Sequence, residues 1–419
     1  MINKYKKVKE ILQKYNQNHI IKFLENSNDE LKEKIAEQVL KIDFEEIKEL
    51  YNKSFEQIYV DLEELQPIAG LNPNKLSKEE VEKIEGIGIE IVKNNKFAVA
   101  TMAGGQGTRL GHLKPKGTYK IKFETEEKYL FEIIVDTLKK ANQEYNVTIP
   151  WYIMTSKENN KDTIEFLEEK EYFGYPKRYV YIFEQGELPL VSEEGKLLIG
   201  KEGLIKEASN GNGGIFNSML KKGVIADMEK RGIEWVFIGS VDNILLKYVD
   251  TLLLGLTVSQ GNQIGTRTVL KRSPEEKVGV LCKQNGRVKV IEYTELPKDI
   301  AKITHDNGEL VFGESHIMCN LFNIDAIKKA STKELEYHIA FKKAEYINEN
   351  GELIKPVEPN AYKFEQFIFD SFKLFDNISI LRGKREEDFA PVKNISGEDS
   401  PETAKKLYEN YWKNKAIMI

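Results

Sequence analysis

A glycine-rich stretch flanked by cations carries the clearest chemistry in this chain. Residues 102–120 read Met-Ala-Gly-Gly-Gln-Gly-Thr-Arg-Leu-Gly-His-Leu-Lys-Pro-Lys-Gly-Thr-Tyr-Lys and follow the apolar run Phe97–Thr101, which is typical of a buried strand. Glycines have no Cβ, so their backbone N–H groups can approach a phosphate closely. Arg109, Lys114 and Lys116 place positive charge within reach of the same anion. The pattern indicates a site for a nucleoside triphosphate.

Two better-known phosphate-binding loops do not fit this stretch. A Walker A loop needs G-x-x-x-x-G-K-[ST], and no segment of the chain has that pattern. The dinucleotide fingerprint G-x-G-x-x-G matches at Gly105 and Gly107 but meets Leu110 where the third glycine belongs. The remaining pattern, Gly-Gly-x-Gly-Thr-Arg-Leu followed by Pro-Lys, resembles the signature of sugar-1-phosphate nucleotidyltransferases. A strand-to-helix turn that merely needs glycine is the structural alternative.

A carboxylate follows a second apolar run. Asp242 comes shortly after Trp235–Ile238, where a strand is expected to end. The carboxyl ends of strands in an α/β sheet form the ligand crevice, so Asp242 is expected beside the glycine loop. A carboxylate there suits a Mg²⁺ that bridges a triphosphate and an attacking phosphate. The alternative is an Asx turn that caps the next helix.

Three further segments offer polar groups to a ligand. Asn212 lies in a second glycine cluster, residues 210–216, and its amide can bond a sugar hydroxyl. Gln185 follows the β-rich run Val180–Phe183, and a glutamine amide both donates and accepts, as recognition of a uracil edge requires. Glu292, in the second strand of a predicted hairpin, can accept from sugar hydroxyls. Taken alone, these segments are equally typical of turns, loops and solvent-facing strands.

The composition excludes several functional classes. The 419 residues carry 62 Lys and Arg against 67 Asp and Glu, for a net charge of −5, so no basic field indicates nucleic acid binding. Cys282 and Cys319 are the only cysteines; they fit a reducing cytoplasm and cannot make a zinc cluster alone. The chain begins without the apolar region of a signal peptide, and its apolar stretches fall far short of the roughly 20 residues of a membrane span. We therefore expect a soluble cytoplasmic protein without a membrane partner.

The elements that must position these residues divide the chain into three predicted regions. Residues 1–94 show helical periodicity, and Ser77–Glu80 is a capping-box pattern that opens a short helix, which Gly86 and Gly88 are expected to end. This region is expected to cover one side of the catalytic domain, with a partner-binding module as the alternative. Residues 95–377 alternate short β-rich runs with helical stretches such as 131–142, which predicts a doubly wound α/β sheet with helices on both faces. Residues 378–419 form a small C-terminal region that ends in a helix starting near Ser400. The predicted strands are Phe97–Met102, Pro150–Thr155, Val180–Phe183, Trp235–Ser240, Gln263–Leu270 and Val278–Lys283.

Read in order, the motifs of this chain resemble those of the UDP-sugar pyrophosphorylases of the eukaryotic type, and within that group the UDP-N-acetylglucosamine pyrophosphorylases most. The likeness runs from Phe97 to Asn394 and implies a nucleotidyltransferase-type mixed sheet flanked by helices. The blocks that carry it are Ala103–Gly111, Pro115–Tyr119, Pro150–Ser156, Tyr172–Gly174, Gly211–Gly214, Val241–Leu245, Val278–Val280, Ile291–Glu295, Lys355–Pro356, Phe367–Asp370 and Phe389–Asn394.

The resemblance implies that residues of the glycine loop, together with Gln185, bind the nucleotide. Backbone groups of Gly104 and Gly105 would contact the uracil, and Gln185 would complete recognition of the base. Arg109 would hold the β- and γ-phosphates, and Lys116 would hold the α-phosphate.

The resemblance also implies a cofactor, further phosphate contacts and a sugar pocket. Mg²⁺ would bind at Asp242, and Lys363 and Lys393 would reach the phosphates, although a single lysine among 62 basic residues is usually solvated surface. The implied sugar-side residues are Gly211, Asn212, Gly279, Glu292 and Asn320, with Phe367 and Phe369 near an N-acetyl group.

Three positions depart from the pattern of that family. Ser209 and Asn210 stand where an acidic residue commonly precedes Gly-Asn-Gly-Gly, and Glu314–Cys319 stands where Gly-Asn is common. Thr118 replaces a common methionine. The first two departures lie on the sugar side of the implied site.

The predicted activity is uridylyl transfer from UTP to N-acetylglucosamine 1-phosphate, which yields UDP-N-acetylglucosamine and pyrophosphate. The sugar phosphate would attack the α-phosphorus in line with the departing pyrophosphate, with no covalent enzyme intermediate. Phe367, Phe369 and the Gly211–Gly214 block favour the amino sugar. The alternatives are the same chemistry on glucose or galactose 1-phosphate, and a non-catalytic sensor of nucleotide sugars. Whether the protein is a monomer or a dimer, and how many metal ions act, stay open.

Overall fold

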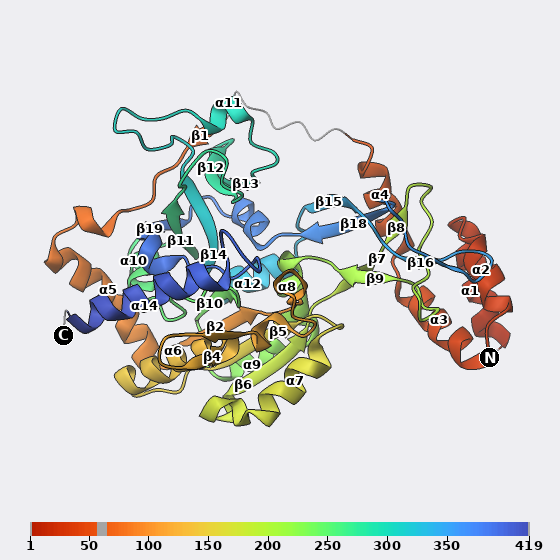
Figure 1. Ribbon diagram of the computed structural model, residues 1–419, viewed down its shortest axis with the longest axis horizontal. Helices are drawn as coiled ribbons and strands as arrows, with labels where there is room; N and C mark the ends of the chain where they lie inside the picture. Colours follow the sequence, from red (N-terminus) through yellow and green to blue (C-terminus); the bar gives the residue numbers. More distant parts are fainter. Residues whose placement is uncertain (1, 57–64, 418–419) are drawn as a thin grey trace. The chain divides into compact units, whose positions relative to one another are not determined.

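The computed structural model describes residues 2–56 and 65–417 and groups them into two compact units (Figure 1). The small unit takes its residues from Met1–Tyr59, Gly186–Gly214 and Leu335–Phe367. The large unit takes its residues from Val60–Gln185, Ile215–Glu334 and Ile368–Ile419. Both units are discontinuous in sequence, whereas the sequence predicts three contiguous regions. The difference arises because two excursions from the large unit return to the N-terminal helices.

The small unit begins with helices whose apolar stripes were predicted. Asn28 caps α3 and Asp43 caps α4 by accepting hydrogen bonds from first-turn amides. Val8, Leu12 and Ile20 of the stripes are fully buried in the core that these helices share with the small strands of the unit. The helices are α1 (Ile2–Lys14), α2 (Asn18–Glu25), α3 (Asp29–Lys41) and α4 (Phe44–Lys53). The strands are β7 (Glu187–Pro189), β8 (Val191–Ser192), β9 (Glu207–Ser209), β15 (Tyr337–Lys342), β16 (Tyr346–Ile347), β17 (Leu353–Ile354) and β18 (Ala361–Gln366).

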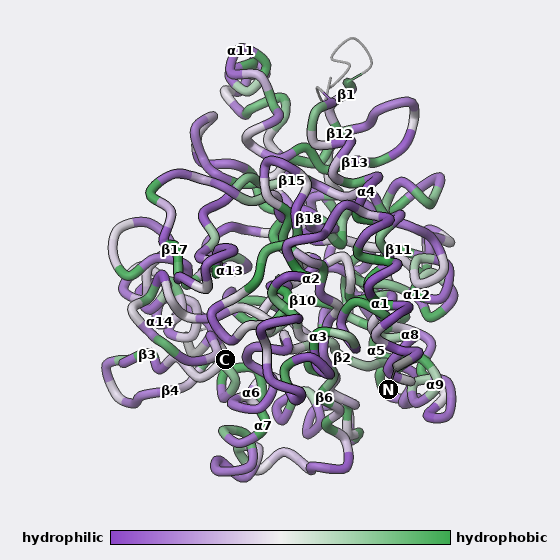
Figure 2. The backbone as a smooth tube through the Cα atoms, turned by 90° about the vertical axis from the view of Figure 1, so that its right-hand side faces the viewer, coloured by the Kyte–Doolittle hydropathy of each residue, from purple (hydrophilic) through white to green (hydrophobic). Residues whose placement is uncertain are grey.

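The large unit is built on a mixed sheet, as the sequence predicts. Strands β2, β5, β6 and β10 are parallel neighbours, and β14 runs antiparallel to β10, β11 and β12. Helices lie along this sheet in Figure 1, and Figure 2 shows hydrophobic residues in its central strands. The strands are β1 (Gln66–Pro67), β2 (Phe97–Met102), β5 (Trp151–Thr155), β6 (Val180–Glu184), β10 (Trp235–Ser240), β11 (Ile264–Leu270), β12 (Val280–Gln284), β13 (Arg287–Ile291), β14 (Glu314–Asn323) and β19 (Ser379–Arg382). A separate hairpin pairs β3 (Lys120–Lys122) with β4 (Glu127–Tyr129).

The six predicted strands are present, and the hairpin between β12 and β13 turns at Asn285 and Gly286, both with positive φ. Strand β14 is not among the predicted strands, because its residues Glu314–Asn323 mix polar and apolar side chains without a simple alternation. Tertiary packing places β14 in the middle of the sheet, where most of its side chains are buried on both faces.

The helices of the large unit match the predicted alternation, with one correction. The glycines at 86 and 88 were expected to end a helix, yet α5 runs through both. Gly88 lies where α5 crosses α10, and a Cβ there would lie 2.0 Å from the carbonyl oxygen of Thr251. Glycine therefore permits close helix packing at this point rather than ending the helix. The helices are α5 (Lys78–Lys93), α6 (Leu130–Tyr145), α7 (Asn160–Glu169), α8 (Ile215–Lys221), α9 (Val224–Lys230), α10 (Thr251–Ser259), α11 (Lys298–Ala301), α12 (Ile324–Ser331), α13 (Arg385–Asp388) and α14 (Pro401–Ile417).

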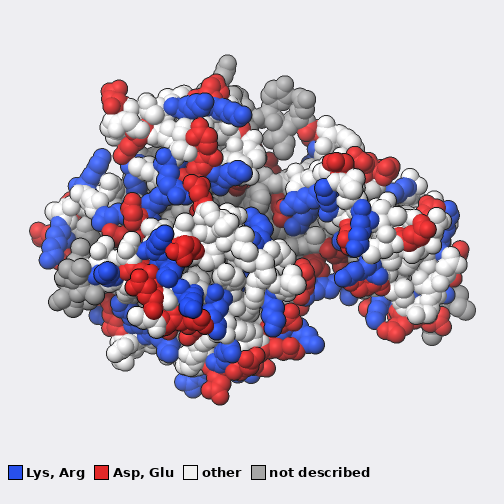
Figure 3. Space-filling model, in the orientation of Figure 1, with Lys and Arg blue, Asp and Glu red and all other residues white. Residues whose placement is uncertain are grey.

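The surface follows the balanced composition. On the face drawn in Figure 3, basic and acidic side chains are interspersed. Across the described part of the chain, no helix has the length and apolar character needed to cross a bilayer.

Candidate active site

Backbone hydrogen bonds fold the glycine loop that follows β2 back on itself. The N–H of Gly107 donates to the carbonyl oxygen of Lys114 at 3.0 Å. The N–H of Lys116 donates to the carbonyl oxygen of Gly105, also at 3.0 Å. These two hydrogen bonds bring the backbone of Lys114 and Lys116 next to that of Gly105 and Gly107.

His112 and Thr118 hold the far end of this loop. The hydroxyl of Thr118 donates to the carbonyl oxygen of Pro115 at 2.8 Å, and Nε2 of His112 lies 2.7 Å from the same hydroxyl. Because the Thr118 hydrogen is used, Nε2 of His112 is the donor of the second bond. Thr118, a departure from the family pattern, therefore has a structural role here. Arg109 lies exposed in the same loop, so its guanidinium is accessible to an anion.

Lys116 and Asp242 form an ion pair at the carboxyl edge of the sheet. Strand β10 runs parallel to β2 with Ser240 opposite Met102, so the two strand ends lie side by side. Nζ of Lys116 lies 2.9 Å from Oδ2 of Asp242, whose other oxygen accepts from the Ser240 hydroxyl at 2.6 Å. The two side chains are 12% and 19% exposed, so solvent screens their charges only in part.

Neighbouring cations keep the Asp242 carboxyl ionised. Burial by itself would raise its pKa, but Lys116, Lys393 and the Ser240 hydroxyl outweigh burial and hold the pKa well below its ordinary value. The residue is therefore a carboxylate at every physiological pH. An ionised carboxylate oxygen is the ligand that a hard divalent cation prefers.

Asn243 brings the C-terminal segment that carries Lys393 to Asp242. Its side-chain Nδ2 donates to the carbonyl oxygen of Asp388 at 2.8 Å. Its Oδ1 accepts from the N–H of Ala390 at 2.8 Å. The side chain is 3% exposed and joins the segment after β10 to one nearly 150 positions later. Sequence reasoning missed this role, since nothing in Val-Asp-Asn indicates which distant segment the amide contacts.

Gly104 and Gln185 lie against each other. A Cβ on Gly104 would lie 3.0 Å from Nε2 of Gln185, so only glycine lets the amide of Gln185 pack this closely. Gln185 is buried at the end of β6, two strands from the glycine loop. By contrast, apart from Gly105 itself and its two chain neighbours, no described heavy atom lies within 4 Å of the Cβ position of Gly105. The two glycines thus serve different geometric needs.

A second group of predicted residues gathers around β12 and β14 of the large unit. Oε1 of Glu292 lies 3.3 Å from the Cβ position of Gly279. The N–H of His316 donates to the carbonyl oxygen of Gly279 at 3.0 Å, and the His316 ring packs edge-on against Phe369. Nε2 of His316 lies 2.8 Å from Oδ1 of Asn320. Three of the predicted sugar-side residues are therefore linked through a histidine that the sequence analysis did not single out.

Asn320 has a different environment from its predicted neighbours. It is fully buried, whereas Glu292 is partly exposed, and its amide oxygen accepts from His316. Burial lowers the pKa of His316 to about 4, so the ring is neutral at neutral pH and donates through Nε2. The backbone N–H of His316 is the group that bonds Gly279. A sugar contact from Asn320 stays a prediction.

The remaining predicted residues belong to the small unit. Gly211 has a φ of +88°, and a Cβ there would lie 2.2 Å from the carbonyl oxygen of Gln366. Asn212 begins a 3-10 turn that packs against the backbone of Phe367. Lys363 pairs with a carboxylate of its own strand at 2.8 Å. The structure thus brings Gly211, Asn212 and Phe367 together within this unit.

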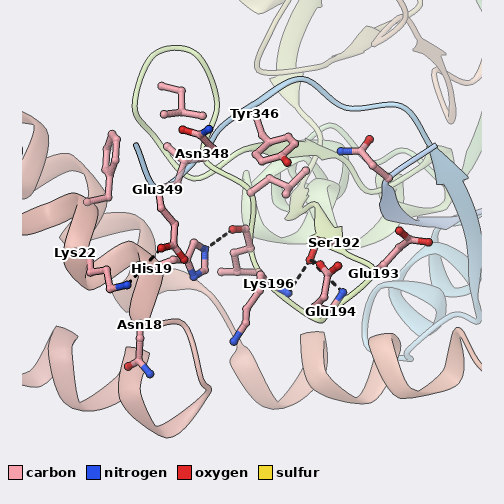
Figure 4. Close-up of a pocket in the computed structure, with 16 residues that line it drawn as sticks. Asn18, His19, Lys22, Ser192, Glu193, Glu194, Lys196, Tyr346, Asn348 and Glu349 are labelled. Carbon is pink, nitrogen blue, oxygen red and sulfur yellow. Dashed lines mark hydrogen bonds and ion pairs between the residues drawn. The ribbon is translucent and has the colours of Figure 1, made fainter. Parts of the chain in front are cut away.

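A pocket of about 470 Å³ also lies in the small unit, lined by α2, the loop after β8 and the β16 segment (Figure 4). Nζ of Lys22 lies 3.3 Å from Oε2 of Glu349, and Nε2 of His19 lies 2.8 Å from the carbonyl oxygen of Leu197. None of the residues predicted to bind substrate lines this pocket.

The metal-binding capacity of the site rests on Asp242. Within the described ranges, no group of three or more His, Cys, Asp or Glu side chains is arranged to hold a metal ion. Mg²⁺ commonly keeps several waters and binds through one or two carboxylates together with substrate phosphates. A single ionised carboxylate beside a phosphate-binding loop fits such an ion.

Known proteins similar to this chain are named as uridylyltransferases or as pyrophosphorylases of UDP-sugars. The family model described as UTP–glucose-1-phosphate uridylyltransferase matches residues 22–398. The human UDP-N-acetylhexosamine pyrophosphorylase-like protein 1 is 37% identical over 76% of this chain, and the match spans 65% of the human protein. The UDP-N-acetylglucosamine pyrophosphorylase of Saccharomyces cerevisiae is 35% identical over 77% of this chain and 70% of its own length. The crystal structure of the Trypanosoma brucei uridine diphosphate N-acetylglucosamine pyrophosphorylase with an inhibitor is 26% identical and superposes with a TM-score of 0.84, covering 97% of this chain and 84% of that one.

Proposed function

Because this chain belongs to the UTP–glucose-1-phosphate uridylyltransferase family, we propose that it transfers the uridylyl group of UTP to N-acetylglucosamine 1-phosphate. The observation that carries the proposal is the group formed by Lys116, Asp242 and Lys393 beside the glycine loop. The names of the yeast and trypanosomal relatives support the amino sugar.

The reaction needs no protein nucleophile. An oxygen of the sugar phosphate is already anionic and attacks the α-phosphorus of UTP, while the bond to the bridging oxygen breaks and pyrophosphate departs with the electron pair. The two substrates repel each other, so the enzyme must first hold them close and in line. We propose that Lys116 offsets charge at the α-phosphate and that Arg109 holds the departing phosphates.

A divalent cation completes this assignment. We propose that Asp242 provides a carboxylate ligand for Mg²⁺, which would neutralise phosphate charge when it is bound. Lys116 and Lys393 keep that carboxylate ionised and aligned. Chelation of divalent cations is expected to abolish turnover, and addition of Mg²⁺ is expected to restore it.

Base recognition is proposed for Gly104, Gly105 and Gln185. The close packing of Gln185 on Gly104 supports this assignment, because it places a side-chain amide and a backbone amide beside each other. Such a pair can offer the donors and the acceptor that a uracil edge requires. For the sugar, we propose a contact from Glu292, whose carboxylate lies beside Gly279 in the large unit.

A second candidate substrate is glucose 1-phosphate, which the name of the matching family favours. Pyrophosphate release from UTP and Mg²⁺ should therefore be measured in parallel with the 1-phosphates of N-acetylglucosamine, N-acetylgalactosamine, glucose and galactose. A kcat/KM for N-acetylglucosamine 1-phosphate at least about tenfold above glucose 1-phosphate, or about 1.4 kcal/mol, supports the proposal. The reverse order changes the substrate and keeps the chemistry. Tight binding of UTP without turnover on any sugar would indicate a sensor instead.

A further inference from the structure

Asn159 stands where an asparagine normally caps a helix, yet its side chain does something else. It is the residue before α7, and its carbonyl oxygen accepts the first hydrogen bond of that helix. Its side chain makes no capping hydrogen bond and is fully buried. Capping by asparagine typically stabilises a helix by about 1 kcal/mol, so the use of this amide elsewhere needs a reason.

The Asn159 amide is instead directed at the start of the glycine loop. Its Oδ1 accepts from the N–H of Ser156 at 2.9 Å, which fixes the orientation of the amide. Its Nδ2 then donates to the carbonyl oxygen of Ala103 at 3.0 Å and to that of Gly105 at 3.3 Å. Both hydrogens of the NH₂ group are used on two carbonyl groups of one loop.

Holding these carbonyl groups determines where the neighbouring N–H groups point. In a planar trans peptide the C=O and the following N–H point in opposite directions. Because Ala103 directs its C=O toward Asn159, the N–H of Gly104 must point away from it. Within the described ranges, the N–H of Gly104 donates to no other protein group. The same peptide group therefore presents its donor on the side opposite Asn159.

Asn159 also acts on the cationic part of the loop. The Gly105 carbonyl oxygen that it bonds is the one that accepts from the N–H of Lys116. One buried side chain thus fixes both the glycines and the backbone of the lysine that faces Asp242.

We propose that Asn159 is a positioning residue for nucleotide binding, which holds the Ala103–Gly104 peptide so that the Gly104 N–H is preoriented toward the uracil of UTP. This inference rests on the proposed function. A preoriented donor adds to affinity because it does not have to be ordered when the ligand binds. Loss of Asn159 should therefore weaken UTP binding while leaving the sugar phosphate largely unaffected.

The sequence provides a direct spectroscopic readout of this peptide. Ala-Gly occurs twice in the chain, at Ala69–Gly70 and at Ala103–Gly104. Labelling alanine carbonyl carbons with ¹³C and glycine nitrogens with ¹⁵N therefore yields two selective amide signals. The N–H of Gly70 donates to a carboxylate oxygen of Glu314 at 2.8 Å, so its signal is an internal control for a folded large unit.

The test compares wild type, Asn159→Ala, the isosteric Asn159→Asp and a control, Asn142→Ala. Asn142 is a matched control because its amide also makes two tertiary hydrogen bonds, to Tyr175 and from Ile149, and none to the glycine loop. In wild type, UTP should shift the Gly104 signal and leave the Gly70 signal in place. In both Asn159 variants, the Gly104 signal should move or broaden without ligand, and KM for UTP should rise about tenfold or more. KM for the sugar phosphate should stay within about twofold of wild type, as should both KM values of Asn142→Ala.

Three outcomes would contradict the inference. A normal Gly104 signal with a normal KM for UTP in Asn159→Ala would show that the loop does not need this residue. An equal rise in both KM values, shared by Asn142→Ala, would show a general loss of stability. If UTP shifts no signal in wild type and no turnover occurs, the proposed function fails and the inference fails with it. If Asn159→Asp does not fold, Asn159→Ala with an unchanged Gly70 signal still decides the question.

Discussion

Replacing Lys116 with alanine removes the ammonium group that faces Asp242, and we expect kcat to fall at least about a hundredfold. Nζ of Lys116 lies 2.9 Å from Oδ2 of Asp242, and only 12% of the lysine side chain is exposed. Solvent therefore screens this charge weakly. Groups aimed in advance at developing charge contribute about 3 kcal/mol each, and each 1.4 kcal/mol changes the rate by a factor of about ten.

The variant should stay folded, because Asp242 retains the Ser240 hydroxyl and the nearby charge of Lys393. The assay is pyrophosphate release under saturating UTP, Mg²⁺ and sugar 1-phosphate, with thermal unfolding of each variant beside it. Lys120→Ala is the matched control from the same segment. Lys120 also pairs with a carboxylate, at 3.1 Å, but 42% of its side chain is exposed, and such pairs contribute little.

The expected result is a large loss of kcat in Lys116→Ala and a kcat within about twofold of wild type in Lys120→Ala. A Lys116→Ala enzyme with more than about a tenth of the wild-type kcat would refute the assignment of Lys116 to the chemical step. A fall in both variants together would show that the loop tolerates no change, so the ion pair would not be the cause.

Three further predictions follow from particular contacts. Asn243→Ala should lower kcat about tenfold, because it releases the segment that carries Lys393. The same substitution should have little further effect on kcat in a Lys393→Met background. A double-mutant cycle in steady-state kinetics measures this coupling. Gly88→Ala should destabilise the protein by roughly 1–3 kcal/mol, because its Cβ would lie 2.0 Å from a carbonyl oxygen of α10. Gly86→Ala should instead stabilise the protein by about 0.5–1 kcal/mol, because no described atom outside the neighbouring helix backbone lies within 4 Å of its Cβ position. Urea unfolding measures both changes. The depressed pKa of Asp242 stabilises the folded state at pH values above the unfolded-state pKa of about 3.9. This stabilisation is lost as the pH falls through the folded-state pKa. The stability advantage of wild type over Asp242→Asn in urea titrations should therefore shrink below about pH 4.

Sequence patterns within single segments predicted the helices and strands that are specified by residues close together in the chain. Strand β2 and strand β10 are continuous apolar runs, and runs of that kind are stable only when they are buried on both faces. The Ser77–Glu80 capping box was recognised from spacing alone, and the structure contains both of its hydrogen bonds. The expected end of α5 at its glycines was wrong, because a close helix crossing needs glycine as much as a helix end does.

The residues that hold the site in place could not be predicted from such local patterns. Asn159 acts on Ala103 and Gly105, and Asn243 acts on Asp388 and Ala390. An isolated asparagine in a sequence predicts a turn or a cap, since those are its local uses. Which backbone it contacts across the fold depends on the order of the strands.

The sequence by itself indicated a nucleotide-binding loop and the family to which the chain belongs, because glycines and cations at this spacing have few other joint uses. It also determined that a mixed α/β sheet would carry them. Only the tertiary structure decided that Lys116 would face Asp242, that β14 would occupy the centre of the sheet and that His316 would stand next to Gly279. The physical reason is that these contacts join segments far apart in the chain, and their geometry follows from strand pairing and burial rather than from local preference.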